Sequence, residues 1–130
     1  MNERIELHDS TLASVSFSDG LAVVLLAPAY IHRSHGLPGS DAGSGWLQSA
    51  TLTFAGASPV SSPAGLPVWI SDGFLRIDDA LHDNLIPTHG SFEGAVEFSI
   101  VLTTAEVLTI RGRRISIQLL GDSSYLEEYK

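Results

Sequence analysis

Alternation of apolar and polar residues in the segment TLASVSFSDGLAVVLLA, residues 11–27, constrains the fold most strongly. Apolar residues up to Phe17 alternate with serines, Asp19-Gly20 follows, and a continuous apolar run comes next. A period of two is typical of a β-strand, and Asp-Gly favours a type I′ turn because both of its positions need a positive φ. The segment therefore predicts a β-hairpin. The expected partners across it are Phe17 with Ala22, Ser16 with Val23, Val15 with Val24, Ser14 with Leu25, and Ala13 with Leu26.

Two later segments repeat this pattern. The stretch VWISDGFLRI, residues 68–77, predicts a second hairpin that turns at Asp72-Gly73, with Trp69 facing Arg76. Residues 94–120 predict a three-strand meander with turns at 103–104 and 112–113. A strand is expected over 48–57 and a short edge strand over 5–7. The tail SSYLEEYK, residues 123–130, is the one candidate for a helix.

Hairpins in sequence, without helical crossovers, point to antiparallel sheet. We therefore predict an all-β chain, an antiparallel β-sandwich or flattened barrel of about eight strands. It would be built from hairpins and a C-terminal meander, with at most one short C-terminal helix. A length of 130 residues fits a single domain, 1–130.

Charge and composition limit the classes of partner and the kinds of metal site that this chain could have. The formal net charge is −8, which argues against a nucleic-acid partner because phosphate contacts need clustered Lys and Arg. No apolar run is long enough to span a bilayer and no signal peptide is visible, so we expect a cytoplasmic protein without a membrane partner. With no cysteine, any metal site must use His, Asp or Glu.

The segment AYIHRSHGLPGSDAGSGW, residues 29–46, predicts a long recognition loop. It holds two histidines and many glycines, with an aromatic residue near each end, and long loops in compact domains are usually functional or mobile. Aromatic and arginine side chains are enriched in protein interfaces. The candidate binding residues are Tyr30, His32, Arg33, His35, Asp41 and Trp46.

The sequence LHDS, residues 7–10, predicts a structural turn made by His8, Asp9 and Ser10. Asp and Ser side chains bond nearby backbone amides in turns, and His8 would then be a buried, hydrogen-bonded histidine. In LHDN, residues 81–84, the same logic applies, and Asn84 tolerates a left-handed conformation.

A metal site is the alternative use of the histidines, and its candidate ligands are His32, His35, His8 and His82. The His-x-x-His spacing at 32–35 has ligand geometry only on a helix, whereas this segment reads as a loop. Neighbouring His and Asp on a strand point to opposite faces, so they can share one ion only where the backbone turns. The main expectation is therefore no metal and no cofactor.

Enzyme signatures are absent from the sequence. It contains no Gly-x-Ser-x-Gly elbow, phosphate loop or dinucleotide fingerprint. The interpretation therefore leans away from an enzyme, although a metal-binding β-barrel enzyme remains an alternative. A third possibility is a barrel that binds a small molecule or carbohydrate, with Trp46 or Trp69 at its mouth.

The stretch IELHDSTLASVSF…GLAVVLLAPAYIH, residues 5–32, resembles small bacterial β-rich proteins that open with a Leu-His-Asp-Ser motif and a long hairpin. Some of those families are grouped with the immunity proteins of polymorphic toxin systems. The resemblance implies a non-enzymatic protein that neutralises a toxin, and it carries over no catalytic residues. An acidic chain would suit a basic toxin such as a nuclease. Self-association is also expected, through a sheet edge such as the last strand, Ile115–Leu120.

Overall fold

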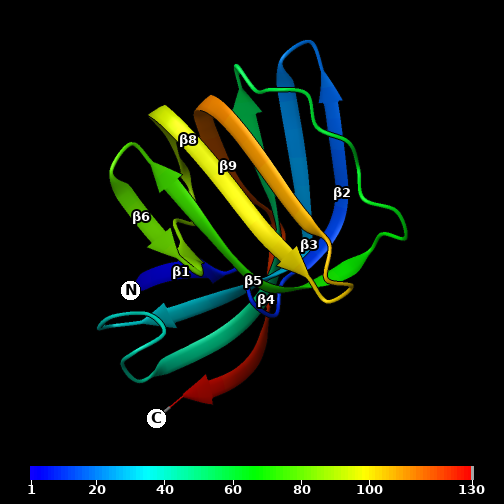
Figure 1. Ribbon diagram of the computed structural model, residues 1–130. Coiled ribbons are helices and arrows are strands. Elements are labelled where there is room, and N and C mark those ends of the chain that lie inside the picture. Colours follow the sequence, from blue (N-terminus) through cyan, green and yellow to red (C-terminus); the bar gives the residue numbers. More distant parts are fainter. Residues whose placement is uncertain (130) are drawn as a thin grey trace.

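The computed structural model describes residues 1–129 and consists of nine β-strands without a helix (Figure 1). The predicted all-β class is confirmed. The strands are β1 (Asn2–Glu6), β2 (Thr11–Ser18), β3 (Leu21–Ser34), β4 (Gly43–Ala55), β5 (Val68–Ile77), β6 (Ala80–Asp83), β7 (Leu85–Ile86), β8 (Gly90–Leu102) and β9 (Val107–Tyr129). Over residues 1–129 no helix is long and apolar enough to cross a membrane.

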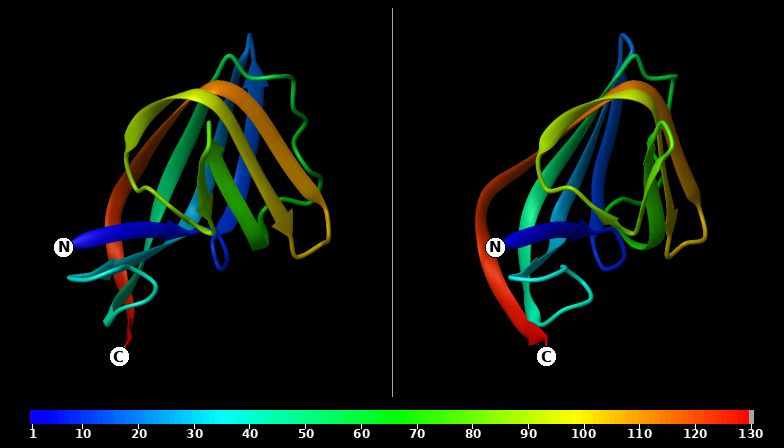
Figure 2. Two further views of the ribbon diagram at one scale, coloured as in Figure 1. Left: turned by 60° about the vertical axis from the view of Figure 1, so that its left-hand side comes forward. Right: turned by 90° about the vertical axis from the view of Figure 1, so that its left-hand side faces the viewer.

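All nine strands belong to one antiparallel sheet with the order β2-β5-β8-β9-β4-β3-β1-β7, and β6 is added beside β5. Besides β5, β2 also pairs with β3, so six strands curl into a ring (Figure 2). The closure is partial, because β2 meets β5 over only two residue pairs, Thr11 with Trp69 and Leu12 with Val68. The sheet is therefore neither two stacked sheets nor a true barrel.

Apolar side chains fill the inside of the curled sheet and form one core. Its largest members, Phe54 and Phe98, are fully buried, and their ring centroids lie 5.5 Å apart. The longer strands contribute mainly alternate residues, as the period of two predicts. The interior is therefore a packed core, and functional side chains are to be sought on the outer surface and at the ends of the sheet.

The first hairpin forms as predicted. Asp19 and Gly20 have φ of 51° and 76°, which is the type I′ requirement. Val15 is opposite Val24, as predicted. The predicted pairs nearer the turn, and the pair of Ser14 with Leu25, are also present. The exception is at the far end, where a bulge places Leu12 opposite Leu26 in place of Ala13.

The second predicted hairpin is wrong. Residues 68–77 form the single strand β5, and its turn lies at Asp78, where φ is 53°. Gly73 lies inside β5. A Cβ at this position would lie 2.7 Å from Ile100 Cγ2 and 2.9 Å from the Ser99 carbonyl oxygen, so the close packing of the strand favours glycine there. Trp69 does not face Arg76, whose guanidinium lies over Phe74 with its Cζ 5.6 Å from the ring centroid.

The C-terminal meander has two strands in place of three. The turn at 103–104 is confirmed, but residues 112–113 continue within the 23-residue strand β9. The predicted helical tail is wrong for the described residues up to 129, which pair with the start of β4. Pairing along a whole strand outweighs the weak helix propensity of a few residues.

Past the ring, one end of the sheet extends as a separate flap (Figure 1). We call it the terminal lobe, and it consists of β1, the end of β3 (29–34), the start of β4 (43–48) and the end of β9 (121–129). A bulge in β3 at residues 26–29, next to Pro28, separates the lobe from the ring. The predicted binding residues all lie on this lobe or on its connecting loop.

Candidate functional site

The expected long loop is mostly strand. β3 continues to Ser34 and β4 begins at Gly43, so only residues 35–42 form the connection. Side chains alternate across the sheet, and the predicted binding residues are therefore divided between two faces of the terminal lobe. Arg33 and Trp46 lie on one face, and Tyr30 and His32 lie on the other.

Arg33, Trp46 and Tyr125 form a compact cluster on the first face, which we call the aromatic patch. The Trp46 and Tyr125 rings meet edge to face with centroids 5.3 Å apart. The Arg33 Cζ lies 4.6 Å from the centroid of the Trp46 ring, within the range of a cation–π contact. Tyr125 is 53 % exposed, while Trp46 and Arg33 are partly buried. Sequence reasoning missed Tyr125 because it lies 79 residues from Trp46 along the chain (125 − 46).

Polar contacts fix the orientation of the patch. Arg33 Nε donates to Glu3 Oε2 at 3.0 Å, and its Nη1 donates to Ser123 Oγ at 3.3 Å. Trp46 Nε1 donates to Ser44 Oγ at 2.8 Å. The patch thus holds its side chains in place before any partner binds, which lowers the entropy cost of binding.

His35 and Asp41 lie in the short connecting loop, and both are exposed. Asp41 Oδ2 accepts a hydrogen bond of 2.6 Å from the Leu37 backbone N–H, so Asp41 holds the loop in shape. Neither residue contacts the aromatic patch through a hydrogen bond or ion pair in the described chain.

The second face buries the other two predicted binding residues. Tyr30 is 5 % exposed and His32 is 7 % exposed, so these two side chains offer little surface to a partner. The His32 ring stacks on Tyr129 with centroids 4.9 Å apart, and the Tyr30 ring is tilted against it with centroids 5.0 Å apart. This histidine is therefore enclosed by two tyrosines of the terminal lobe.

Gly45 makes room for this packing. A Cβ on Gly45 would overlap the Tyr30 hydroxyl, and it would lie 2.8 Å from Tyr30 Cζ and 2.9 Å from Tyr129 Oη. The Tyr30 hydroxyl donates to Glu127 Oε1 at 3.0 Å, which ties β3 to the end of β9 across β4. The glycine therefore serves a close approach between strands.

His32 has an unusual polar environment. Its Nε2 is buried and makes no hydrogen bond within residues 1–129. That atom lies 3.4 Å from Glu6 Oε2, close enough for an ion pair if the imidazole is protonated, but without hydrogen-bond geometry. Tyr129 packs against His32 in the same environment. Its pKa is raised to about 12, first by burial and then by the negative charges of Glu6 and Asp9.

The predicted turn occurs at His8, Asp9 and Ser10. Asp9 has φ of 73°, and buried Ser10 donates its hydroxyl to the Glu6 carbonyl at 2.6 Å and accepts from the Tyr30 N–H at 2.9 Å. The expectation of a buried His8 is wrong, since its side chain is 53 % exposed. Asn84 adopts φ of 65° and accepts a hydrogen bond from the His8 backbone N–H.

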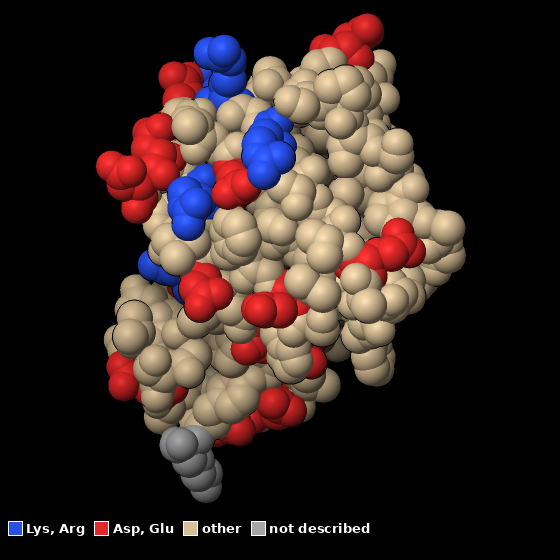
Figure 3. Space-filling view, in the orientation of Figure 1, with Lys and Arg blue, Asp and Glu red and all other residues tan. Residues whose placement is uncertain are grey.

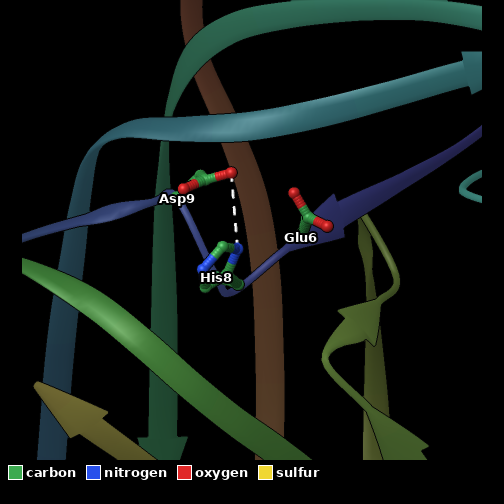
Figure 4. A group of neighbouring side chains, drawn as sticks. All are labelled: Glu6, His8 and Asp9. Carbon is green, nitrogen blue, oxygen red and sulfur yellow. Dashed lines mark ion pairs between the residues drawn. The ribbon is translucent and has the colours of Figure 1, made fainter. Parts of the chain in front are cut away.

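The structure changes the set of possible metal ligands. His35 belongs to the connecting loop and His82 to β6, so neither joins the others. Glu6, His8 and Asp9 come together at the turn, where one ligand atom from each lies within 4.8 Å of the others (Figure 4). We call these three residues the turn cluster. Glu6 was not among the predicted ligands, although it stands two residues before His8 in the sequence.

Neither tryptophan supports a ligand-binding mouth. Trp69 is 68 % exposed at the outer surface. One hollow of ≈ 580 Å³ is lined by Glu93, Arg111, Arg113 and small residues, without a tryptophan. Arg111 of this lining pairs with Glu97, and Glu93 of the lining pairs with the neighbouring Arg114. Figure 3 shows basic (blue) and acidic (red) side chains interleaved in the upper left of the face in view.

β9 has an unpaired edge on the terminal lobe. β8 pairs with β9 only as far as Ile117, while β4 pairs with its other side up to Tyr129. Within residues 1–129 no strand pairs with the outer side of residues 118–129, which we call the free edge. The predicted edge at Ile115–Leu120 is wrong for residues 115–117, because β8 covers them.

Comparison of the chain with protein-family models, curated proteins and solved structures finds no match.

Proposed function

We propose that the protein is a non-enzymatic binding module that recognises another protein through the aromatic patch. The observation that carries the proposal is the cluster of Arg33, Trp46 and Tyr125 on one exposed face of the terminal lobe. Tryptophan, tyrosine and arginine are the residue types most enriched among binding hot spots. Here all three are in contact and held by polar neighbours.

Charge favours a basic partner. The chain has a net charge of −8, Asp122 and Glu128 lie on β9 with Tyr125, and Glu3 of β1 pairs with Arg33 of the patch. Acidic residues around an apolar centre accelerate association with a basic protein and discriminate against acidic ones. A toxin with a basic active-site surface, such as a nuclease, is such a partner. The resemblance of residues 5–32 to immunity-type proteins supports the same choice.

The test is direct binding to a basic nuclease toxin, measured by calorimetry, and the product of the gene adjacent to that of this chain is the first protein to try. We expect a 1:1 complex that Trp46→Ala weakens at least tenfold, the equivalent of about 1.4 kcal/mol. Trp69→Ala is the matched control, because this tryptophan is exposed but lies outside the patch. Its complex should stay within twofold of the unmutated protein.

Two outcomes would contradict the proposal. One is the absence of binding together with no protection of cells that express the toxin. The other is equal affinity for the unmutated protein and Trp46→Ala, with Trp69→Ala weakened instead.

A further inference from the structure

The β1–β2 turn brings together side chains that a straight strand would separate. Residues 8 and 9 would point to opposite faces of a strand, but Asp9 has φ of 73° and the chain reverses there. As a result His8 Nδ1 lies 3.3 Å from Asp9 Oδ2. Figure 4 shows the carboxylates of Asp9 and Glu6 turned toward one another beside the His8 ring.

Two separations, one inside the turn cluster and one between Glu6 and His32, match those between ligands of one small metal ion. Zinc binds imidazole nitrogen and carboxylate oxygen at about 2.0–2.2 Å, so two ligands at a tetrahedral angle lie roughly 3.3–3.6 Å apart. The His8–Asp9 pair is separated by 3.3 Å, and the pair formed by His32 Nε2 and Glu6 Oε2 is separated by 3.4 Å. Glu6 is the common neighbour, because it belongs to the turn cluster and also faces His32.

His32 supplies a second, independent observation. Its ring is more than nine-tenths buried, and its Nε2 has no hydrogen-bond partner within the described chain although it points at Glu6. A buried polar atom without a partner costs roughly 1–3 kcal/mol, so it calls for a physical explanation. Coordination of a cation by this nitrogen would satisfy it.

Local charge also favours a cation. Glu6 and Asp9 place two carboxylates at the turn, and the only basic groups of residues 1–129 within ion-pair distance of them are histidines. Arg4, the nearest arginine in sequence, donates to the Glu3 carbonyl. The exposed side chains of His8 and Asp9 leave the position open to solvent, which gives an ion a route of entry.

We propose that Glu6, His8, Asp9 and His32 form a binding site for one divalent transition-metal ion of the Zn²⁺ type. Two nitrogen and two oxygen ligands suit Zn²⁺ better than Mg²⁺ or Ca²⁺, which take oxygen ligands. The exposed pair, His8 and Asp9, turns inward to complete the site around Glu6. Four protein ligands leave no open position, so the ion fastens the β1–β2 turn to β3 and has no catalytic part. This site does not depend on the proposed protein partner.

The experiment uses the full chain after removal of metal with a chelator. Zn²⁺ alone is added, bound zinc is counted by plasma mass spectrometry after dialysis, and affinity is measured by calorimetry. Co²⁺ as a substitute reports tetrahedral coordination through its visible absorption. We expect one Zn²⁺ per chain and a rise in Tm on binding, because an ion that binds only the folded chain stabilises it.

Variants separate this site from adventitious binding at a surface histidine. His8→Ala and Asp9→Asn change exposed side chains, so they should fold normally and lose affinity at least tenfold. His32→Gln should lose it as well, and His35→Ala is the matched control with unchanged affinity. Failure to bind one Zn²⁺ would overturn the site. So would affinity that survives in His8→Ala, affinity that survives in His32→Gln, or affinity that falls with His35→Ala.

Discussion

Replacement of Gly45 by alanine tests whether close packing on the second face of the terminal lobe holds the lobe together. The new methyl group would lie against the Tyr30 hydroxyl, with Tyr30 Cζ at 2.8 Å and Tyr129 Oη at 2.9 Å. Tyr30 is buried against His32 and has little room to move, whereas Tyr129 is partly exposed near the chain end. The strain therefore falls mainly on Tyr30.

Two opposing effects set the change in the free energy of unfolding that Gly45→Ala should cause. Overpacking of a filled site costs roughly 1–3 kcal/mol. Gly45 does not have a positive φ, so alanine fits the backbone and recovers about 0.4–1 kcal/mol from the unfolded state. We expect Gly45→Ala to lower the free energy of unfolding by about 1.5 kcal/mol. For a chain of this length this corresponds to a fall in Tm of roughly 5 °C.

A double-mutant cycle with Tyr30→Phe isolates the contact. Tyr30→Phe alone loses the hydrogen bond to Glu127, a loss of about 1 kcal/mol. It also removes the atom that crowds the new methyl group, so the double variant should be more stable than the sum of the single effects by about 1 kcal/mol. The rescue is partial because Tyr30 Cζ remains near.

Urea unfolding followed by tryptophan fluorescence and circular dichroism measures all four proteins. Trp46 reports on the terminal lobe itself. The reasoning is refuted if Gly45→Ala changes the free energy of unfolding by less than 0.5 kcal/mol. Strict additivity of the two substitutions would refute it equally.

Three further predictions follow from other parts of the molecule. Gly73→Ala should lower the free energy of unfolding by about 2 kcal/mol in urea unfolding, because its Cβ would lie 2.9 Å from the immobile Ser99 carbonyl oxygen. Tyr129 should ionise near its pKa of about 12, raised by burial, then by Glu6 and Asp9, in the phenolate absorbance difference between the unmutated protein and Tyr129→Phe. Since this pKa lies above that of the unfolded chain, the stability that the phenol contributes is intact below pH 10 and is lost as the pH rises through 12. The free edge should pair with a second copy, so light scattering should give a mass near twice 13.9 kDa, and a mass of 13.9 kDa would contradict this.

Local turn chemistry predicted the first hairpin but failed at the second Asp-Gly. Asp19-Gly20 connects two strands that pair with each other, so the dipeptide alone specifies the turn. Asp72-Gly73 has the same letters, but its strand pairs with β8, and Asp72 Oδ1 accepts from the Gly73 N–H inside that strand. A dipeptide cannot indicate which distant strand will pair beside it, and that pairing decides between a turn and a continuous strand.

The same limit explains the tail. Its residues favour neither helix nor strand strongly, so a capping serine and two glutamates made a short helix a reasonable expectation. In the structure Tyr125 pairs with Trp46 and Glu127 with Gly45, which extends β9 along the whole of β4. The outcome depended on partners nearly eighty residues away, beyond the reach of propensity.

The sequence indicated some of the residues of the candidate site but not how they are arranged. Arg33 and Trp46 were both among the predicted binding residues, but their mutual contact was not predicted, and a turn was expected at residues 8–10. Neighbouring side chains of β3 point to opposite faces of the sheet. Arg33 therefore contacts the aromatic patch, whereas His32 points toward Glu6. Adjacent residues thus supply two separate surfaces, a recognition patch on one face and a candidate ion site on the other.

The bulge beside Pro28 determines which residues face each side, because one extra residue in β3 exchanges the faces of every position after it. Without that bulge the histidine would take the exposed face and the arginine the buried one, and neither surface could form.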